Sequence, residues 1–327
     1  MPNSIVLGTG SYAPRRILSN ADLEKIVKTN NEWIVSRTGI KERRIAADDE
    51  ATSDLAAAAA REALQFAGVE PEDVDMIVVC TVTGDTPTPS CAAFVQARLG
   101  AKNAFAFDVG AACAGSLYGL SIADQFIRSG QVKRALVVGA ETLSRFVDWS
   151  NRETCVLFGD AAGAILLGAT EEEGRGVLAA KLRTDGSMTG ILGIYGGGSR
   201  RPPSSEMLEE KADKIKMRGR EVYKVAIRLL PEIVAETLQA AGLTAADITH
   251  VIAHQANQRI IESALQNLGV PLEKCWINID RYGNTSSASM PITLDEANRA
   301  GKLKPGDVIA MMAIGAGMTW GGAVLRW

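Results

Sequence analysis

The sequence EALQFAGVEPEDVDMIVVC at residues 62–80 recurs as ETLQAAGLTAADITHVIAH at residues 236–254, an offset of 174 positions (62 to 236). Both copies keep a Leu-Gln pair, an Ala-Gly pair and an Asp at matching places. Each reads as a helix that ends at Gly, a turn, and then an apolar strand. One helix-turn-strand unit is therefore predicted to occur twice in this chain.

Outside the repeat, short apolar runs alternate with Ala-rich helical patterns, which is typical of an α/β protein. Strands are expected at 76–80, 104–107, 135–138, 164–167, 251–253, 276–279 and 308–312, and helices at 53–67 and 117–128. Two weaker matches keep the order of the repeat, 135–140 with 311–316 and 163–166 with 322–325. We expect two similar halves, residues 1–172 and 173–327, joined near 171–176, with a site where they meet.

Composition narrows the class of protein. The chain has 327 residues, 46% of them hydrophobic, and a formal net charge of −3, which argues against broad nucleic-acid binding. Its five cysteines are scattered and lack C-x-x-C spacing, so they indicate neither a disulfide framework nor a zinc site. The N-terminus does not resemble a signal peptide, and no apolar run is long enough to span a membrane. A cytoplasmic location is expected.

Cys113 is a candidate nucleophile. It stands in DVGAACAGS, residues 108–116, between an expected strand and the first turn of an expected helix. Unpaired N–H groups at a helix start stabilise negative charge, as a thiolate needs, and the small neighbours leave room for an acyl group, although the sequence does not give the pKa of Cys113. The alternative is a small buried core residue, which free cysteines usually are.

Three further features point to the same chemistry. His254, one of two histidines, lies at the end of the expected strand 251–253. Asn284, in GNTSS after the strand expected at 276–279, is the approximate counterpart of Cys113, and its alternative is a turn or helix cap. The glycine-rich segment 314–322 can direct a backbone N–H near Ala316 at an oxyanion, or can simply be a tight turn between strands.

Taken together, these motifs resemble the β-ketoacyl-acyl carrier protein synthase III family of the thiolase superfamily. The matching segments run almost end to end: NEWIVSRTGIKER (31–43), the Cys113 block, FGDAAG (158–163), MRGREVY (217–223), HQANQR (254–259), YGNTSS (282–287) and GAGMTWG (315–321). The resemblance implies a thiolase-like five-layered αβαβα core made of two pseudo-symmetric halves. It also implies a homodimer.

The resemblance further implies a decarboxylative condensation of an acyl-CoA with malonyl-acyl carrier protein. Cys113 would accept the acyl group, and His254 with Asn284 would serve decarboxylation and condensation. The backbone N–H groups of Cys113 and Ala316 would form the oxyanion hole. No cofactor or metal is implied, because CoA thioesters are the substrates.

The resemblance also assigns residues to each substrate. CoA would be bound by Trp33, Arg37, Arg152 and Asn257, the carrier protein by Gln255, Arg259 and Lys224, and the acyl chain by Thr88, Leu143 and Phe158. Thr88 stands where several relatives carry Phe, so we expect primers longer or more branched than acetyl to fit. The alternative for the arginines is an ordinary solvated surface. The segment 196–207 reads as a loop whose role stays open.

Three other functions remain open at this stage. The segment GTGSYA, residues 8–13, follows an apolar run and mimics a dinucleotide-binding motif, although no helix pattern begins directly after it. A non-catalytic acyl-binding scaffold would keep the fold without turnover. Within the enzymes, a secondary-metabolite condensing enzyme or an ester-forming acyltransferase is the second candidate.

Overall fold

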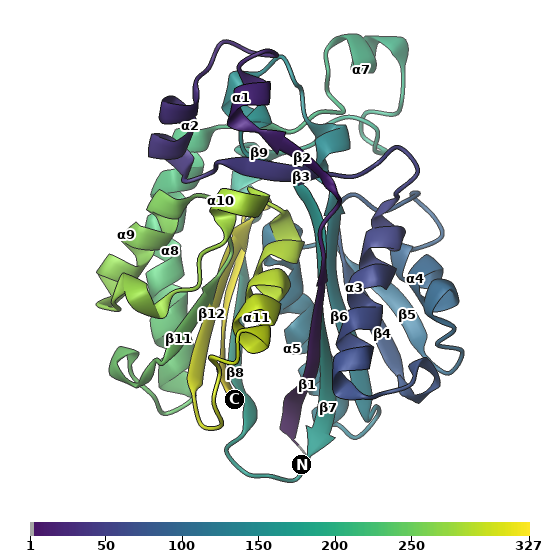
Figure 1. Cartoon of the computed structure of the whole chain (residues 1–327), viewed down its shortest axis with the longest axis vertical. Coiled ribbons are helices and arrows are strands. Elements are labelled where there is room, and N and C mark those ends of the chain that lie inside the picture. Colours follow the sequence, from purple (N-terminus) through teal and green to yellow (C-terminus); the bar gives the residue numbers. More distant parts are fainter. Residues whose placement is uncertain (1–2) are drawn as a thin grey trace.

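The computed structural model describes residues 3–327 and arranges them in five layers of alternating helices and sheets. Figure 1 shows the layers side by side: α8 and α9, a four-stranded sheet, α5 with α11, a five-stranded sheet, and α3 with α4. The helices of these layers are α3 (Thr52–Ala67), α4 (Cys91–Leu99), α5 (Gly115–Arg128), α8 (Gly219–Ala240), α9 (Gln258–Leu268) and α11 (Ser289–Arg299). The predicted five-layered α/β architecture is confirmed.

Each sheet takes its strands from one side of the connection at residues 171–175. The first sheet has the order β1 (Asn3–Tyr12), β7 (Asp160–Thr170), β6 (Arg134–Thr142), β4 (Met76–Cys80), β5 (Phe105–Val109). The second has the order β11 (His250–Ala253), β12 (Val308–Gly315), β13 (Thr319–Arg326), β8 (Gly176–Thr184). The pairs β4–β5, β4–β6 and β11–β12 are parallel, and the others are antiparallel.

Shorter elements cover the end of the sheets that carries the site. They are β2 (Arg16–Ser19), α1 (Asn20–Leu23), α2 (Asn31–Thr38), β3 (Glu42–Ile45), α6 (Arg152–Cys155), β9 (Leu192–Gly193), α7 (Ser205–Glu209), β10 (Lys216–Met217) and α10 (Ile279–Tyr282). Three 3₁₀ turns matter for the site: η2 (Ala112–Ala114), η3 (Leu143–Phe146) and η7 (Ser286–Ala288). The loop predicted at 196–207 lies in this cap and runs into α7 (Figure 1).

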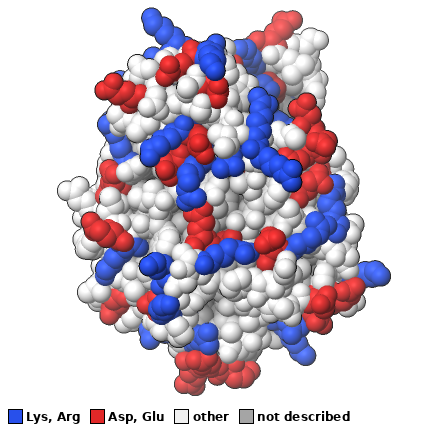
Figure 2. Space-filling view, viewed as in Figure 1, with Lys and Arg blue, Asp and Glu red and all other residues white. Residues whose placement is uncertain are grey.

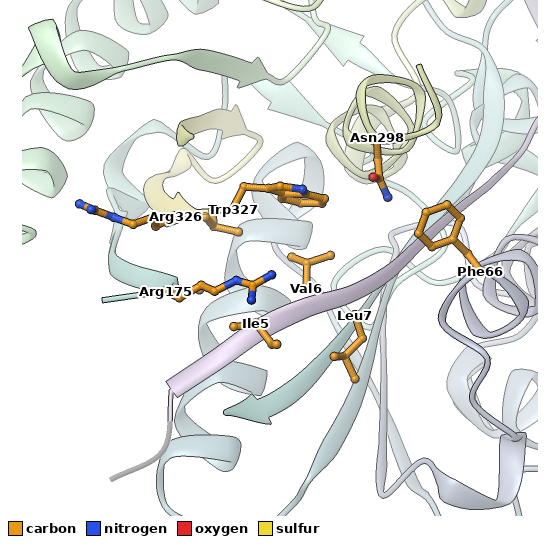
Figure 3. Close-up of a pocket in the computed structure, with 10 residues that line it drawn as sticks. Ile5, Val6, Leu7, Phe66, Arg175, Asn298, Arg326 and Trp327 are labelled. Carbon is orange, nitrogen blue, oxygen red and sulfur yellow. The ribbon is translucent and has the colours of Figure 1, made fainter. Parts of the chain in front are cut away.

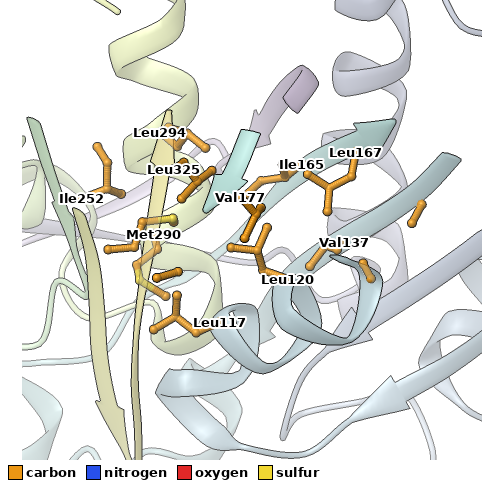
Figure 4. Close-up of a cluster of buried hydrophobic side chains, with 14 of the residues drawn as sticks. Leu117, Leu120, Val137, Ile165, Leu167, Val177, Ile252, Met290, Leu294 and Leu325 are labelled. Atoms are coloured by element: carbon orange, nitrogen blue, oxygen red, sulfur yellow. The ribbon is translucent and has the colours of Figure 1, made fainter. Parts of the chain in front are cut away.

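The core lies between the two sheets, around the central helices. Leu117 and Leu120 of α5 pack between Ile165 of the first sheet and Leu325 of the second (Figure 4). Met290 of α11 belongs to the same buried cluster. The apolar positions of α5 face both sheets at once, and the two polar residues on its buried side, Ser116 and Asp124, are both hydrogen-bonded. That packing holds the two halves in one fixed relation.

Most predicted elements are confirmed, and one is wrong. The strands expected at 76–80, 135–138, 164–167, 251–253 and 308–312 lie within β4, β6, β7, β11 and β12, and 104–107 overlaps β5. No strand forms at 276–279. Only Cys275 bridges to β11, at Val251, and the chain then turns into α10. The second sheet therefore lacks the strand that would correspond to β5.

Strand register shows that the repeat extends further than the sequence match. Ile77 pairs with Leu136 in the first sheet, and Val251 pairs with Ala310 in the second. Equivalent residues of the two halves are again 174 positions apart (77 and 251, 136 and 310). Residues 135–140 therefore correspond to residues 309–314, and the predicted match with 311–316 is two residues out of register. By the same offset the counterpart of Cys113 is Ser287, and Asn284 lies three residues before it.

The dinucleotide-binding alternative is wrong. Gly8 and Gly10 lie inside β1, which pairs along its length with β7, and not in a strand-to-helix turn. A Cβ atom at Gly8 or Gly10 would overlap the backbone carbonyls of Ala63 and Ala59 in α3. These glycines therefore allow a helix to pack closely on a strand.

Charges of both signs alternate over the face shown in Figure 2. None of the helices described is long and apolar enough to cross a membrane. Within residues 3–327, no group of three or more His, Cys, Asp or Glu side chains is arranged to hold a metal ion. All five cysteines are free thiols.

Candidate active site

A cavity of about 1110 Å³ runs from the surface to the junction of the two halves. It is lined by ten of the residues predicted from sequence: Trp33, Arg37, Cys113, Arg152, Phe158, Lys224, His254, Asn257, Arg259 and Asn284. Arginines and a tryptophan lie at its exposed mouth, and the thiol, the imidazole and one carboxamide lie at its buried end. A volume of this size accommodates an extended ligand.

Cys113 lies at the middle of η2, directly before α5, and is 8% exposed. Ala112 before it has φ 46°, in the left-handed region that non-glycine residues seldom occupy, and this sharp turn joins β5 to the helix. Burial raises the pKa of the Cys113 thiol to about 12, although the Ser286 side chain and the backbone N–H of Cys113 lower it. The pKa of Cys113 could not be inferred from the sequence, and in the structure desolvation outweighs the groups that stabilise a thiolate.

The glycine-rich turn after β12 lies against the nucleophile. A Cβ atom at Gly315 would stand 2.6 Å from the backbone nitrogen of Cys113, so only glycine allows this approach. The Thr319 hydroxyl donates to the Ala111 carbonyl at 2.9 Å and fastens the far side of the turn. Ala316 is partly exposed and follows Gly315 directly. Its place in an oxyanion hole stays a prediction.

Asn284 is held by its backbone on both sides. Its N–H donates to the Leu157 carbonyl at 2.8 Å, and its carbonyl accepts from the N–H of Gly159 at 3.1 Å. Its side-chain Oδ1 accepts from the N–H of Ser286 at 2.9 Å, which leaves the Nδ2 hydrogens for the cavity. The amide therefore faces the cavity as a hydrogen-bond donor.

His254 follows β11 and is 5% exposed. Its Nδ1 lies 2.7 Å from the Ser289 hydroxyl, and its buried Nε2 has no hydrogen-bond partner within residues 3–327. Burial lowers the pKa of His254 to about 3, so the imidazole is neutral at physiological pH. A neutral imidazole and a carboxamide can together offer two uncharged donors to an oxyanion.

This neutral histidine makes folding stability depend on pH. The pKa is about 3 when folded and about 6.5 when unfolded, so between these values the unfolded chain binds the additional proton and acid destabilises the fold. From pH 7 to pH 5 we expect His254 to reduce the free energy of unfolding by about 2 kcal/mol. Urea unfolding at both pH values should show this loss in the wild type and not in His254→Asn. An equal loss in both proteins would contradict the assignment.

Sequence reasoning missed Glu141, whose buried carboxyl group binds the loop after β4 and turn η7 next to the site. Glu141, at the end of β6, accepts from the Thr83 hydroxyl at 2.6 Å, the Thr81 hydroxyl and the Val82 N–H at 3.2 Å, and the Ser287 hydroxyl at 3.1 Å. Burial raises its pKa, and these donors act against that rise. The available signal was one acidic residue within an otherwise apolar strand run.

At the mouth of the cavity, two arginines lie over one tryptophan. The guanidinium carbons of Arg37 and Arg152 lie 4.9 and 4.6 Å from the Trp33 ring centroid. Both arginines are exposed, whereas the indole is half-buried. A planar cationic group on an aromatic face suits the base and phosphates of a nucleotide. The three predicted CoA-binding side chains are thus brought together, although their role is still a prediction.

Two protein-family models match the chain in order. The model of 3-oxoacyl-[acyl-carrier-protein] synthase III matches residues 107–186, and the model of its C-terminal part matches residues 238–327. The β-ketoacyl-[acyl-carrier-protein] synthase III of Caldanaerobacter subterraneus subsp. tengcongensis is 52% identical over 322 residues, covering 98% of this chain and 97% of the relative. The chain belongs to the β-ketoacyl-acyl carrier protein synthase III family.

Solved structures agree with this membership. The crystal structure of 3-oxoacyl-[acyl-carrier-protein] synthase III from Aquifex aeolicus VF5 superposes with a TM-score of 0.92 at 47% identity, covering 99% of this chain and 100% of the other. The priming β-ketosynthase of the R1128 polyketide biosynthetic pathway also gives 0.92, at 36% identity, covering 99% and 96%. The thiolase-like fold predicted for this synthase III is confirmed.

The carrier-protein contacts predicted for this synthase III divide into two groups. Arg259 and Lys224 are exposed beside the cavity mouth, as a docking surface requires. Gln255 is only 1% exposed, and its Nε2 donates to the carbonyls of Ala253 and Trp276 at 3.0 and 3.2 Å. The structure contradicts a direct contact of Gln255 with a carrier protein, because the side chain is used to hold the end of β11.

Asn257 begins α9 and joins the two halves of the synthase III. Its Oδ1 accepts from the N–H of Arg259 at 2.9 Å, and its Nδ2 donates to the Arg37 carbonyl at 3.0 Å. Both ends of the amide are therefore engaged by the protein while the residue still lines the cavity. Its predicted contact with CoA stays a prediction.

The three predicted acyl-pocket residues lie in different places. Phe158 lines the cavity and bridges to Asn284. Leu143 is buried in the same apolar cluster as Phe158 but does not line this cavity, so its place in an acyl pocket stays a prediction. Thr88 is exposed on the loop before α4 and does not line the cavity of its own chain.

A second cavity, of about 180 Å³, lies at the opposite end of the junction (Figure 3). Ile5 and Val6 of β1, Phe66 of α3 and the C-terminal Trp327 line it, and Arg175 points toward it. It contains no thiol, imidazole or carboxylate side chain. Among the cavities described here, the chemistry of a synthase III is found only in the larger one.

Proposed function

We propose that this synthase III condenses an acyl-CoA primer with malonyl-acyl carrier protein, giving a 3-oxoacyl-acyl carrier protein, CoA and CO₂, and so initiates fatty acid synthesis. The observation that carries the proposal is the convergence of Cys113, His254 and Asn284 at the buried end of one cavity. The mouth of that cavity carries Trp33 between two arginines, as a CoA site requires.

In the first half-reaction, the Cys113 sulfur attacks the thioester carbonyl of the acyl-CoA. The backbone N–H groups of Cys113 and Ala316 stabilise the tetrahedral oxyanion. The carbon–sulfur bond to CoA then breaks, and the thiol proton of Cys113 leaves with CoA as its thiol. Burial raises the pKa of that thiol, whereas the Ser286 side chain and the backbone N–H of Cys113 act against the rise and stabilise the sulfur as it loses its proton.

In the second half-reaction, malonyl-acyl carrier protein loses CO₂ and becomes an enolate. Its oxygen accepts hydrogen bonds from the His254 imidazole and the Asn284 amide, which are neutral donors in a dry site. The α-carbon attacks the acyl carbonyl on Cys113, a carbon–carbon bond forms, and the cysteine leaves as a thiolate that takes up a proton. No cofactor or metal enters this scheme.

Separate half-reaction assays of single variants test these roles. Cys113→Ala removes the sulfur, so we expect no acyl adduct by mass spectrometry after incubation with acyl-CoA, while decarboxylation of malonyl-acyl carrier protein continues. His254→Ala removes one oxyanion donor, so we expect decarboxylation to fall about 100-fold or more while Cys113 is still acylated. The opposite pattern would overturn the role assignments.

The same assays address the other functions. A non-catalytic scaffold predicts no adduct on Cys113 even in the wild type. A secondary-metabolite condensing enzyme shares the first half-reaction, and the similarity to a priming β-ketosynthase favours it as the second candidate. An ester-forming acyltransferase would transfer the acyl group without release of CO₂.

We also propose a homodimer built on the edge of the five-stranded sheet. Strand β5 ends that sheet, and its Phe105 is 46% exposed, stacked on Phe107 with ring centroids 6.3 Å apart. Val82, in the loop after the neighbouring strand, is also exposed. An apolar edge strand with unpaired backbone groups is a site for pairing with a second copy.

Substitution at this edge tests the dimer. Phe105→Arg places a charge where the two strands would meet, so we expect a monomer by size-exclusion chromatography with light scattering, and a dimer for the wild type. Phe66→Arg is the matched control, because Phe66 is equally exposed on α3, away from β5. A monomeric wild type, or a dimeric Phe105→Arg, would refute this interface.

In the proposed dimer, Thr88 would line the acyl pocket of the partner subunit. The exposed loop that carries Thr88 lies beside the same sheet edge, so it would reach the cavity of the partner and not its own. A small side chain there leaves space for additional methylenes, each worth about 0.8 kcal/mol on burial.

Primer preference should therefore respond to residue 88. We expect the wild type to be acylated by C4 to C12 or branched acyl-CoA with a higher kcat/KM than by acetyl-CoA, and Thr88→Phe to shift this preference toward acetyl-CoA. Acetyl-CoA should remain a substrate of both proteins, which controls for damage to the site. A wild type that prefers acetyl-CoA would refute the proposed enlargement of the acyl pocket at Thr88.

The remaining assignments rest on the same function. We propose that Arg259 and Lys224 receive the acidic carrier protein, that the halves divide at 172/173, and that the enzyme works in the cytoplasm on small thioesters. Residues 1–2 of the first half lie outside the described part of the chain. Charge pairing at the mouth would increase the association rate more than the affinity.

A further inference from the structure

The segment at residues 194–215 leaves the wall of the large cavity and returns to it. It contains the loop at 196–207, whose role the sequence left open. The segment begins after β9 and ends before β10, and these two strands pair with each other. Leu192 of β9 and Met217 of β10 line the cavity. Both ends of the segment are therefore fixed at the cavity, and its middle is free to contact another part of the protein.

Two lysines attach the segment to the loop that joins β6 to α6. The Lys211 ammonium donates to Asp148 Oδ1 at 2.9 Å and to Ser150 Oγ at 2.7 Å. The Lys214 ammonium donates to the Arg145 carbonyl at 3.0 Å. The Lys211 contacts lie closer to α6, because Asp148 and Ser150 immediately precede that helix.

Lys211 is held in an unusual backbone conformation. Its φ is 52°, in the left-handed region that non-glycine residues seldom occupy. The lysine side chain is 46% exposed, so its ion pair with Asp148 contributes little to the stability of the fold. Strain of this kind persists where surrounding contacts fix a residue, and it often marks a functional position. The pair therefore matters for geometry more than for stability.

The acceptor of Lys211 shapes the turn that begins α6. Burial acts to raise the pKa of Asp148, but hydrogen bonds from Ser150 and Lys211 lower it to about 2, so the group is ionised at physiological pH. Its Oδ1 accepts from the N–H of Ser150 at 3.0 Å, and its carbonyl accepts from the N–H of Asn151 at 2.9 Å. Asn151 Oδ1 then caps α6 by accepting from the N–H of Glu153 at 3.0 Å.

The first residue of α6 is Arg152, one of the two arginines at the mouth of the cavity. Its guanidinium carbon lies 4.6 Å from the Trp33 ring centroid, and its Nη1 donates to the Lys28 carbonyl at 3.3 Å. The guanidinium thus reaches from α6 to the segment around α2. Because Arg152 directly follows the turn at 148–151, the path of that turn sets where the guanidinium lies.

We propose that Lys211 is a positioning residue for the nucleotide end of acyl-CoA: it holds the turn at 148–151 so that α6 presents Arg152 over Trp33. The proposal rests on the function proposed above, in which Arg152 and Trp33 bind CoA, and adds a residue that does not line the large cavity. It also gives the segment at 194–215 a role, because the segment carries Lys211.

Two thioesters that differ in the nucleotide test this role. Acetyl-CoA carries the nucleotide and acetyl-pantetheine lacks it. Lys211→Met keeps the aliphatic stem and removes the ammonium. We expect its KM for acetyl-CoA to rise about 5- to 10-fold with little change in kcat, an effect of the size that losing hydrogen bonds to a charged group produces. Its KM for acetyl-pantetheine and its decarboxylation of malonyl-acyl carrier protein should match the wild type. An equal rise for both thioesters would refute the assignment to the nucleotide.

Two further variants control for the segment itself. Arg201 pairs with Glu210 at 2.6 Å within the same segment, so Arg201→Met removes a cation and an ion pair there and should retain the wild-type KM. Lys211→Gly removes the ammonium and relieves the left-handed strain, so it should behave as Lys211→Met does. A wild-type KM in Lys211→Gly, or a raised KM in Arg201→Met, would contradict the role of the ammonium.

A double variant tests whether Lys211 acts through Arg152. Arg152→Ala removes the guanidinium that the turn is proposed to place. We expect Lys211→Met to raise the KM for acetyl-CoA no further when Arg152 is already alanine, because the two residues act on one contact. Effects that multiply would refute this route.

The outcomes separate this proposal from the function on which it rests. A wild type that acetyl-CoA does not acylate on Cys113 would refute the proposed function. An acylated wild type whose Lys211→Met variant keeps the wild-type KM for acetyl-CoA would refute the role of Lys211 only. Thermal unfolding of each variant identifies any that is misfolded, and Lys211→Gln then replaces Lys211→Met in each measurement.

Discussion

The close contact of the two turns before the central helices governs this structure. Turn η2 precedes α5 and turn η7 precedes α11, and the Ser116 hydroxyl donates to the Ser287 carbonyl across the junction. A Cβ atom at Gly139 would overlap that same carbonyl, so the strand between the turns must carry glycine there. Because the reactive groups follow strand ends or occupy these turns, this contact places residues from two halves in one cavity.

The same contact explains why only one of two similar sites is open. At the constant offset, Cys113 corresponds to Ser287 and Gly315 to Glu141. Gly315 leaves space beside the nucleophile, whereas Glu141 fills the equivalent space and accepts a hydrogen bond from Ser287. Removing the Glu141 carboxyl would take the acceptor from buried donors at Thr83 and Val82, whereas the Ser287 hydroxyl would keep its hydrogen bond to the Cys80 carbonyl at 2.6 Å. One copy is thus an open reactive site, and the other is a filled polar cluster that stabilises the turn beside it.

Sequence reasoning predicted what depends on pattern. The repeat, most strands, both helices assigned and the three reactive residues follow from periodicity and order, and the structure places those residues in one cavity. Sequence reasoning failed where tertiary contacts determine the burial or the conformation of a residue. Burial raises the pKa of Cys113, Gln255 is buried where contact with a carrier protein was predicted, and residues 276–279 turn into α10 and add no strand to the sheet. None of these follows from local residue type, and neither does the Glu141 cluster.

The site therefore works with neutral groups that are buried from solvent. Desolvation keeps the Cys113 thiol protonated and His254 uncharged, so neither group carries charge before the substrate arrives. An enolate that forms among fixed neutral dipoles is stabilised without the penalty of desolvating an ion pair. Such dipoles help only if each presents a hydrogen and not a lone pair. For Asn284 the backbone of turn η7 meets that requirement, because the N–H of Ser286 occupies Oδ1 and leaves the amide hydrogens facing the cavity.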